Sequence, residues 1–312
     1  MSQFQIQLKH GFCAGVKKGR NSFVWVMKII IPIAFLVTLL HWSGWLYRVD
    51  FLLKPLMGLI NLPAEAALPI IIGMLSGIYG VIAAIAVLPF TVEQMTLIAI
   101  FTLIAHSLIM EGVIQSKSGV SMVKATLLRI AAAALTVLIV SQFFDETTRG
   151  VVTTDVIVRT PLVEVLKVWA VDMLVLAAKI FVIIMAIMII LESLASLGWI
   201  KYLLKPLKPF MRILGLSDRV TMGWVAAVVF GLMYGATVII DQSKKGGLTK
   251  EELEHLHISI GINHSMVEDP ALFMALGLNG FWLLVPRFIM AIIVVWVSQA
   301  VKYLKKGIRA AS

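Results

Sequence analysis

Cysteine and charge are both scarce in this chain. Cys13 is the one cysteine among 312 residues, so no intramolecular disulfide can form. It precedes the first apolar stretch instead of following one, which does not fit a lipid-attachment cysteine, and we expect a free thiol on the cytoplasmic side. Charged residues make up 14% of the chain, against about 25% in soluble domains, and hydrophobic residues make up 60%. This composition predicts an integral membrane protein.

The motifs of soluble enzymes are missing as well. The sequence has no phosphate-binding loop, no nucleophile elbow and no cysteine pair for zinc. Its first 22 residues are polar and basic, and they continue into an apolar stretch too long for a signal-peptide core. We therefore expect a protein that is not an enzyme, uses no cofactor and has no cleaved signal peptide.

Basic residues outnumber acidic ones, with 27 Lys and Arg against 17 Asp and Glu, for a net charge of +10. They gather at the edges of apolar stretches, where they determine orientation and meet anionic lipid headgroups. No basic motif carries interleaved aromatic residues. We expect membrane lipid as a partner and no nucleic acid, and the sequence leaves homo-oligomerisation open.

The second half of the chain repeats the first, and the repeat includes polar residues inside apolar segments. His106 and His264 differ by 264 − 106 = 158 positions. The same shift relates Ser107 to Ser265, Glu111 to Asp269 and Arg129 to Arg287. Many transporters form their central site from duplicated polar residues at membrane depth.

Eight apolar stretches divide equally between the two repeats. They lie at about 23–47, 64–88, 92–115, 121–144, 168–195, 217–240, 250–277 and 280–301. The predicted organisation is a cytoplasmic basic N-terminus (1–22), repeat one (23–144), an external connector (145–167), repeat two (168–303) and a basic C-terminal tail (304–312).

Orientation follows from lysine and arginine in short loops, which favour the cytoplasmic side. The N-terminus, the 196–216 loop and the C-terminus are all rich in these residues. Eight simple crossings would place the 196–216 loop outside. If 64–88 and 217–240 instead enter the membrane and return, all three basic segments lie inside and the second repeat is inverted. We therefore predict an all-α polytopic membrane protein with two inverted-topology repeats, each of three transmembrane helices and one re-entrant hairpin, in a bacterial-type cytoplasmic membrane.

Glycines interrupt both predicted hairpins and permit sharp backbone turns. We expect the hairpin tips to form gates beside a substrate, because non-helical backbone at membrane depth must be buried in protein or line a polar cavity. A straight helix with closely packed glycines is the alternative. The candidate gate residues are Ser76, Gly77, Tyr79, Gly80, Gly231, Tyr234 and Gly235.

Each helix with the duplicated motif begins at a capping box, Thr91-Val-Glu-Gln94 in one repeat and Thr249-Lys-Glu-Glu252 in the other. Ser107 and Glu111 are four residues apart and should share a helix face, with His106 about 100° to one side. Inverted repeats could bring the two polar sets to one cavity. The candidate residues for substrate binding or coupling are His106, Ser107, Glu111, Asn263, His264, Ser265, Glu268 and Asp269.

Three functions and one structural role fit these residues. They could bind a polar organic solute, form a proton relay, or hold a divalent metal through His106, Glu111, His264 and Asp269. They could also be a hydrogen-bonded cluster that holds helices together. The nearby His255-Leu-His257 pair is interpreted as part of a charged helix start and not as a metal site.

Arg129 and Arg287 each lie 23 residues after a motif histidine. An arginine within the membrane is costly unless it is paired. We expect structural ion pairs with Glu111 in the first repeat and with Asp269 or Glu268 in the second. Recognition of an anionic substrate is the alternative.

The chain resembles the nucleoside-recognition, or Gate, family of membrane proteins, which includes the spore maturation A and B proteins. Similar domains occur in concentrative nucleoside and ferrous-iron transporters. The resemblance is carried by the glycine-broken segments at 73–80 and 231–235, by Ile262-Asn-His-Ser-Met-Val-Glu-Asp-Pro270, and by Pro286-Arg287. It implies re-entrant hairpins beside a substrate and a nucleoside-like solute. Ferrous-iron members use cysteines in their gate segments, and this chain has none there.

The sequence therefore predicts a secondary transporter of a small polar solute, with H⁺ or Na⁺ as the coupling ion. A divalent metal-ion transporter is the first alternative, and a membrane scaffold or complex subunit is the second.

Overall fold

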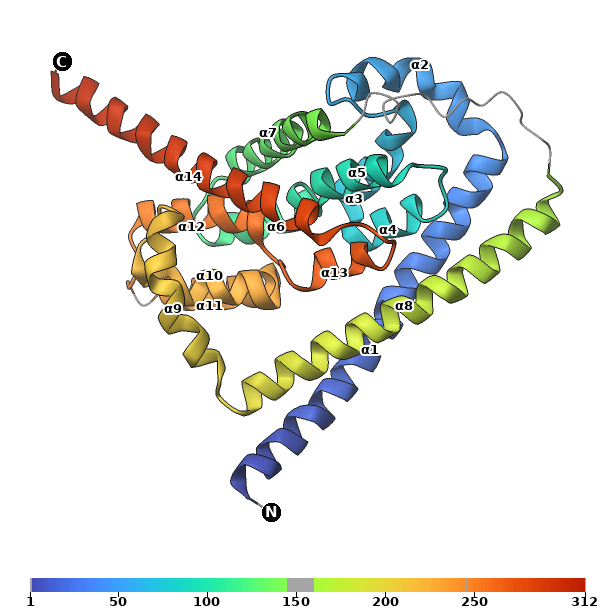
Figure 1. The fold of residues 1–312 in the computed structure, drawn as a ribbon. Helices are drawn as coiled ribbons and strands as arrows, with labels where there is room; N and C mark the ends of the chain where they lie inside the picture. The colour runs from blue at the N-terminus through green and yellow to red at the C-terminus, as the bar shows by residue number, and fades with distance from the viewer. Residues whose placement is uncertain (1, 145–159, 245, 312) are drawn as a thin grey trace.

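The computed structural model describes residues 2–144, 160–244 and 246–311, with the backbone alone at 46, 47, 49, 50, 200, 201, 203–206, 208, 233, 234, 244 and 306–311. The described residues form helices and no strands, which confirms the all-α class (Figure 1). Most of the external connector predicted at 145–167 lies outside the described residues. The helices are α1 (Gln3–Trp42), α2 (Trp45–Gly58), α3 (Ala67–Ser76), α4 (Ile78–Ile85), α5 (Val92–Ile104), α6 (Leu108–Lys117), α7 (Met122–Val140), α8 (Leu162–Ser196), α9 (Ile200–Ile213), α10 (Thr221–Phe230), α11 (Leu232–Lys244), α12 (Lys250–Asn263), α13 (Glu268–Met274) and α14 (Gly280–Ala311).

Five helical segments in the described part of the chain are long and apolar enough to cross a membrane. They are Gln3–Trp42, Val92–Lys117, Met122–Phe143, Leu162–Ser196 and Gly280–Lys305. These segments overlap five of the six predicted crossings. The sixth, 250–277, is instead the 14-residue α12 followed by the 7-residue α13. The first half of α12 carries several charged residues, so this segment lacks a long apolar helix.

The longest helices, α1 and α8, form an antiparallel pair (Figure 1). Phe23 contacts Phe181 near the middle of the pair, and the Trp42 indole at one end donates a hydrogen bond to the Thr160 carbonyl. Three glycines of α1 at four-residue spacing, Gly11, Gly15 and Gly19, face α8. Small residues at this spacing let two helices approach closely. The basic segment predicted as a cytoplasmic N-terminus is thus part of α1 and packs against α8.

Both glycine-interrupted segments fold as helical hairpins. α3 and α4 pack side by side and meet at Gly77, and α10 and α11 do so at Gly231. The two glycines have φ values of 94° and 87°, a region that L-residues with side chains rarely adopt. Helices of 8 and 10 residues, as in the first hairpin, are about 12 and 15 Å long, too short to span an apolar layer of about 30 Å.

Gly80 and Gly235 do not lie at the hairpin turns, contrary to the sequence-based prediction. They lie inside α4 and α11, where a Cβ would come within 2.5 Å of Ile72 and Ala227 in the preceding helix. Their role is to let the two helices of each hairpin approach. Ser76, the last residue of α3, donates its hydroxyl to the Ile72 carbonyl.

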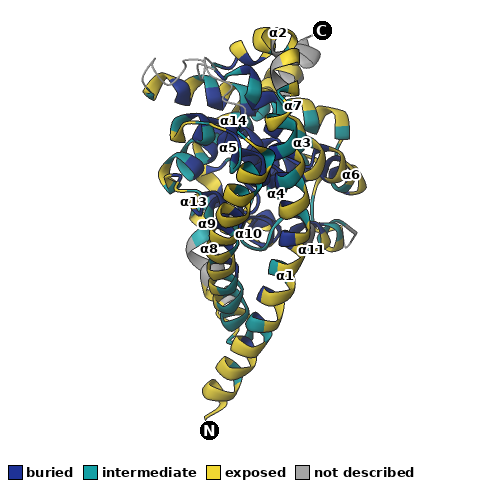
Figure 2. Ribbon diagram, turned by 90° about the vertical axis from the view of Figure 1, so that its right-hand side faces the viewer, coloured by how far each residue is buried: buried dark blue, intermediate teal, exposed yellow. Residues whose placement is uncertain are grey.

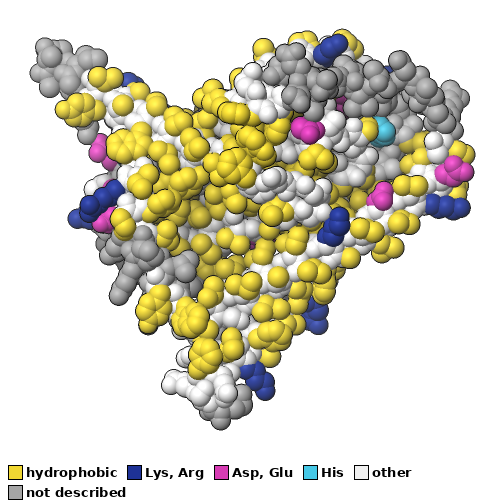
Figure 3. Space-filling model, in the orientation of Figure 1, with side chains coloured by type: hydrophobic (Ala, Val, Ile, Leu, Met, Phe, Trp, Pro, Cys, Tyr) yellow, Lys and Arg dark blue, Asp and Glu magenta, His cyan; other side chains and the backbone are white. Residues whose placement is uncertain are grey.

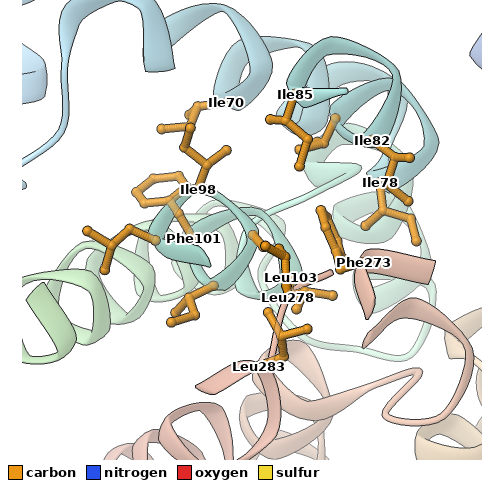
Figure 4. Close-up of a cluster of buried hydrophobic side chains, with 14 of the residues drawn as sticks. Ile70, Ile78, Ile82, Ile85, Ile98, Phe101, Leu103, Phe273, Leu278 and Leu283 are labelled. Atoms are coloured by element: carbon orange, nitrogen blue, oxygen red, sulfur yellow. The ribbon is translucent and has the colours of Figure 1, made fainter. Parts of the chain in front are cut away.

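The main apolar core joins the two halves of the chain. Figure 4 shows side chains of α3, α4 and α5, among them Ile78, Ile82 and Leu103, beside Phe273 and Leu283 of the second half. Buried residues concentrate in these central helices, and exposed residues dominate the N-terminal part of α1 (Figure 2).

The outer surface is largely apolar over the long helices (Figure 3). Leu174 and Val182 on α8 and Trp296 on α14 are all exposed. Monomeric soluble proteins rarely expose apolar patches of this kind, and here the patches lie on helices long enough to cross a membrane.

Candidate functional site

The two His-Ser motifs lie at helix breaks and not within continuous helices, which corrects the sequence-based prediction. Both capping boxes are confirmed, and they start α5 and α12. α5 ends at Ile104, with Ala105 between it and His106, and α12 ends at Asn263, directly before His264. Ser107 and Ser265 then adopt left-handed conformations, with φ values of 46° and 51°.

The hairpins bind the backbone at these breaks. The Ser107 amide donates to the Gly73 carbonyl at 2.9 Å, and the Ser265 amide donates to the Ala227 carbonyl at 3.0 Å. These contacts satisfy backbone groups that a broken helix leaves without partners. Each hairpin therefore contacts a break directly, with the Ser107 hydroxyl next to Gly77.

The two motif histidines meet at the interface between the halves. Their Nε2 atoms are 3.1 Å apart, and both side chains are buried. The other ring nitrogen is held by the preceding helix, since His106 Nδ1 is 2.8 Å from the Thr102 carbonyl and His264 Nδ1 is 2.9 Å from the Ile260 carbonyl. No sequence pattern predicted these two carbonyl partners.

The hydrogen bonds indicate which ring nitrogen of each histidine carries a hydrogen. A carbonyl oxygen can only accept, so each Nδ1 carries a hydrogen. In a neutral ring, Nε2 is then a bare acceptor. Glu111 Oε1 lies 3.2 Å from both Nε2 atoms, which places three acceptors together in a buried site. Such a group is repulsive unless a cation, either a proton or a metal ion, lies among its atoms.

Arg129 neutralises Glu111 from the opposite side, at 2.6 Å between Nη1 and Oε2. It also donates to the carbonyls of Ile104 and His106, so it stabilises the unwound backbone at the first break. Arg287 occupies the corresponding place at the second break and donates to the carbonyls of Ile262 and His264. Its predicted pairing with Asp269 or Glu268 is absent from the ion pairs of the described residues.

The acids of the second motif have different partners from Glu111. Asp269 accepts a hydrogen bond from the Ser265 hydroxyl at 2.8 Å, and its other oxygen is 3.8 Å from His106 Nε2. Glu268 accepts a hydrogen bond from the Tyr79 hydroxyl of the first hairpin at 3.1 Å. The centre is therefore asymmetric, with one acid between the imidazoles and one at its edge.

The predicted site residue Asn263 has no hydrogen bond to this network. Asn263 is fully buried beside His264, and neither side-chain atom has a hydrogen-bond partner. The Tyr234 side chain lies outside the described residues.

His106, Glu111 and His264 also satisfy the distance requirement for a metal site. One ligand atom from each lies within 4.8 Å of the other two. The separations of 3.1 and 3.2 Å are close to the roughly 3.3 Å expected between ligands of a tetrahedral ion with metal–nitrogen bonds of about 2.0 Å.

Comparison with known proteins places the chain in a family. A family model described as nucleoside recognition (Gate) matches residues 23–144. A protein of Bacillus subtilis (strain 168) named "Uncharacterized membrane protein YvoD" is 30% identical over 297 residues, which cover 92% of this chain and 93% of the relative. No solved structure matches the chain. The chain belongs to the nucleoside-recognition (Gate) family of membrane proteins.

Proposed function

We propose that the protein is a cation-coupled secondary transporter of a small polar solute. The observation that carries the proposal is the buried triangle of His106 Nε2, His264 Nε2 and Glu111 Oε1. The two histidines come from helix breaks in both halves, and Glu111 comes from the first turn of α6. Broken helices at the interface of two repeats are a usual location of transporter sites. The antiparallel pairing of α1 with α8, the first helices of the two halves, is what inverted repeats would produce.

The coupling ion is a proton in this proposal. Na⁺ favours oxygen ligands, whereas two of the three acceptors here are imidazole nitrogens. A proton on either Nε2 would convert that ring into a donor to the other ring and to Glu111. The three atoms would then attract one another instead of repelling.

The solute would enter where the hairpin tips contact the breaks. The side chains of the centre contact one another directly, so a solute would require the tips at Gly77 and Gly231 to move. The family description suggests a nucleoside-like solute. Ser76 directly before the turn and Tyr79 in the first turn of α4 could each accept a hydrogen bond from such a solute, because their hydroxyl hydrogens are donated to Ile72 and Glu268.

Proteoliposomes filled with a pH-sensitive dye test the proposal. Nucleosides and nucleobases are added outside in turn, and solute-driven acidification of the interior is measured. We expect at least one solute to produce acidification, and His264→Ala to abolish it. His10→Ala, which changes an exposed histidine of α1, is the matched control and should behave like the wild type.

A transition-metal carrier is the second candidate. It is favoured by the separations of the three ligand atoms, which are close to those between three ligands of a tetrahedral metal ion. Co²⁺ absorption spectroscopy separates the two candidates, since tetrahedral Co²⁺ has intense visible bands. Stoichiometric binding that is lost in both His106→Ala and Glu111→Gln would favour the metal carrier. If no solute causes acidification, no Co²⁺ binds and the His264→Ala protein is merely less stable, the centre is structural and the scaffold alternative takes precedence.

A further inference from the structure

An open cleft of about 740 Å³ lies outside the histidine centre, between α7 and α14 with α12 behind them. Both α7 and α14 are among the helices long enough to cross a membrane. They run antiparallel, because Phe143, in the helical turn that follows α7, contacts Trp282 near the start of α14. The start of α7 and the end of α14 therefore lie at the same end of the cleft.

That end of the cleft is basic. The lysines that line it are Lys124, Lys250, Lys302 and Lys305. Glu254 is the only acid among the described residues that line the cleft, and it binds Lys302 at 2.7 Å. Arg129 also lines the cleft, but its charge is paired with Glu111. The four lysines and one acid therefore leave a net positive charge of 4 − 1 = 3 at this end.

Two buried polar side chains add hydrogen-bonding capacity at the basic end. Gln115 and His257 both line the cleft and are each 1% exposed. Neither the amide of Gln115 nor either ring nitrogen of His257 has a hydrogen-bond partner. Buried polar groups usually have partners, so these groups indicate a ligand with polar oxygens. α12 begins with charged residues, as predicted, and His257 lies further along the helix, where it is buried.

The opposite end of the cleft is apolar. Its walls are formed by Leu128, Ala131, Ala132 and Leu135 of α7 and by Met290, Ile293 and Val294 of α14. About 16 Å of helix separate Lys124 from Leu135. The cleft therefore changes from cationic and polar to apolar along its length.

We propose that this cleft binds an anionic phospholipid. The phosphodiester would lie among the four lysines, with headgroup and ester oxygens hydrogen-bonded to Gln115 and His257, and an acyl chain would extend along the apolar walls of α7 and α14. Basic pockets between membrane helices favour such lipids, and a fully apolar cleft would not select the headgroup.

Native mass spectrometry of the purified protein tests the proposal with phosphatidylglycerol and with phosphatidylcholine of identical acyl chains. We expect wild type to prefer phosphatidylglycerol. Lys124→Gln/Lys305→Gln should weaken phosphatidylglycerol binding about tenfold or more. Ala131→Trp places a large side chain at an exposed cleft position and should weaken binding without entering the core. The matched control, Lys9→Gln/Lys17→Gln, removes two exposed charges of α1 and should bind like wild type.

Equal affinity of wild type for the two lipids would overturn the proposal, as would unchanged phosphatidylglycerol binding in both cleft variants. Glycerol 3-phosphate is added as a competitor to distinguish a lipid from a free phosphate. If it displaces phosphatidylglycerol at millimolar concentration and Ala131→Trp has no effect, the occupant is a soluble phosphate and the lipid assignment is wrong.

Discussion

Glu111 Oε1, in the first half of the chain, lies 3.2 Å from Nε2 of His264 in the second half. The same carboxylate binds Arg129 through its other oxygen, and both members of that ion pair are at most 3% exposed. One side chain therefore connects an imidazole of the other half to the arginine that supports the first helix break.

Glu111→Gln should lower the free energy of unfolding by roughly 3–5 kcal/mol, because it leaves the buried Arg129 charge without its partner. Denaturation of the protein in nanodiscs measures the loss. Glu164→Gln, at an exposed position of α8, should have no effect. The double variant Glu111→Gln/Arg129→Gln should cost less than the sum of the single variants. Additive losses would show that the two residues do not interact.

Gly15→Leu should separate α1 from α8. A Cβ at Gly15 would lie 2.5 Å from the Ile189 Cα, and backbone cannot move aside as a flexible side chain can. We expect a loss of about 1–3 kcal/mol, the usual cost of overpacking, measured as a lower unfolding midpoint. Gly58→Leu on α2, where a Cβ meets nothing within 4 Å, is the control. Equal midpoints for the two variants would contradict the close approach of α1 and α8.

The two hairpin turns should differ in their tolerance of alanine. Both glycines have positive φ, so either substitution strains the backbone. A Cβ at Gly77 would also lie 2.8 Å from the Ser107 hydroxyl, whereas at Gly231 the corresponding distance to Ser265 is 3.8 Å. Gly77→Ala should therefore lower the thermal midpoint more than Gly231→Ala. Adding Ser107→Gly should recover part of the Gly77→Ala loss, and an absence of recovery would exclude this contact as the cause.

The proposed orientation places Cys13 inside the cell and α2 outside. In intact cells, a membrane-impermeant maleimide should leave Cys13 unlabelled until the membrane is permeabilised. A Cys13→Ser/Gly58→Cys variant should be labelled without permeabilisation, because residue 58 lies on α2 in open surroundings. The opposite labelling pattern would invert the orientation.

Local signals in the sequence were sufficient to predict several structural elements. Capping boxes define the start of a helix within four residues, and both predicted boxes are present. The glycines at 77 and 231 located the hairpin turns, because positive φ is required there. The shift of 158 between His106 and His264 identified the two residues that meet in space.

Other features depend on tertiary contacts that local patterns do not encode. The helix breaks at Ser107 and Ser265 are stabilised by hairpin carbonyls and by Arg129 and Arg287, all distant in sequence. Glu111 lies close to both imidazoles, whereas Asp269 does not. The two copies of the motif have the same pattern, so the sequence could not predict this difference. One missed signal was available in the chain: the spacing of Gly11, Gly15 and Gly19 indicates a close helix contact, although not with which helix.

If the protein transports a cation-coupled solute as proposed, the approach of His106 to His264 determines the order of events in its cycle. A cation between the imidazoles is held by both halves at once, so its binding energy also opposes their separation. Any rocking of one half against the other must lengthen the 3.1 Å distance and thereby dismantle the cation's coordination. Cation release and the opening of this interface would then be a single step, and an occupied centre would act as a latch that holds the two halves together until the cation leaves.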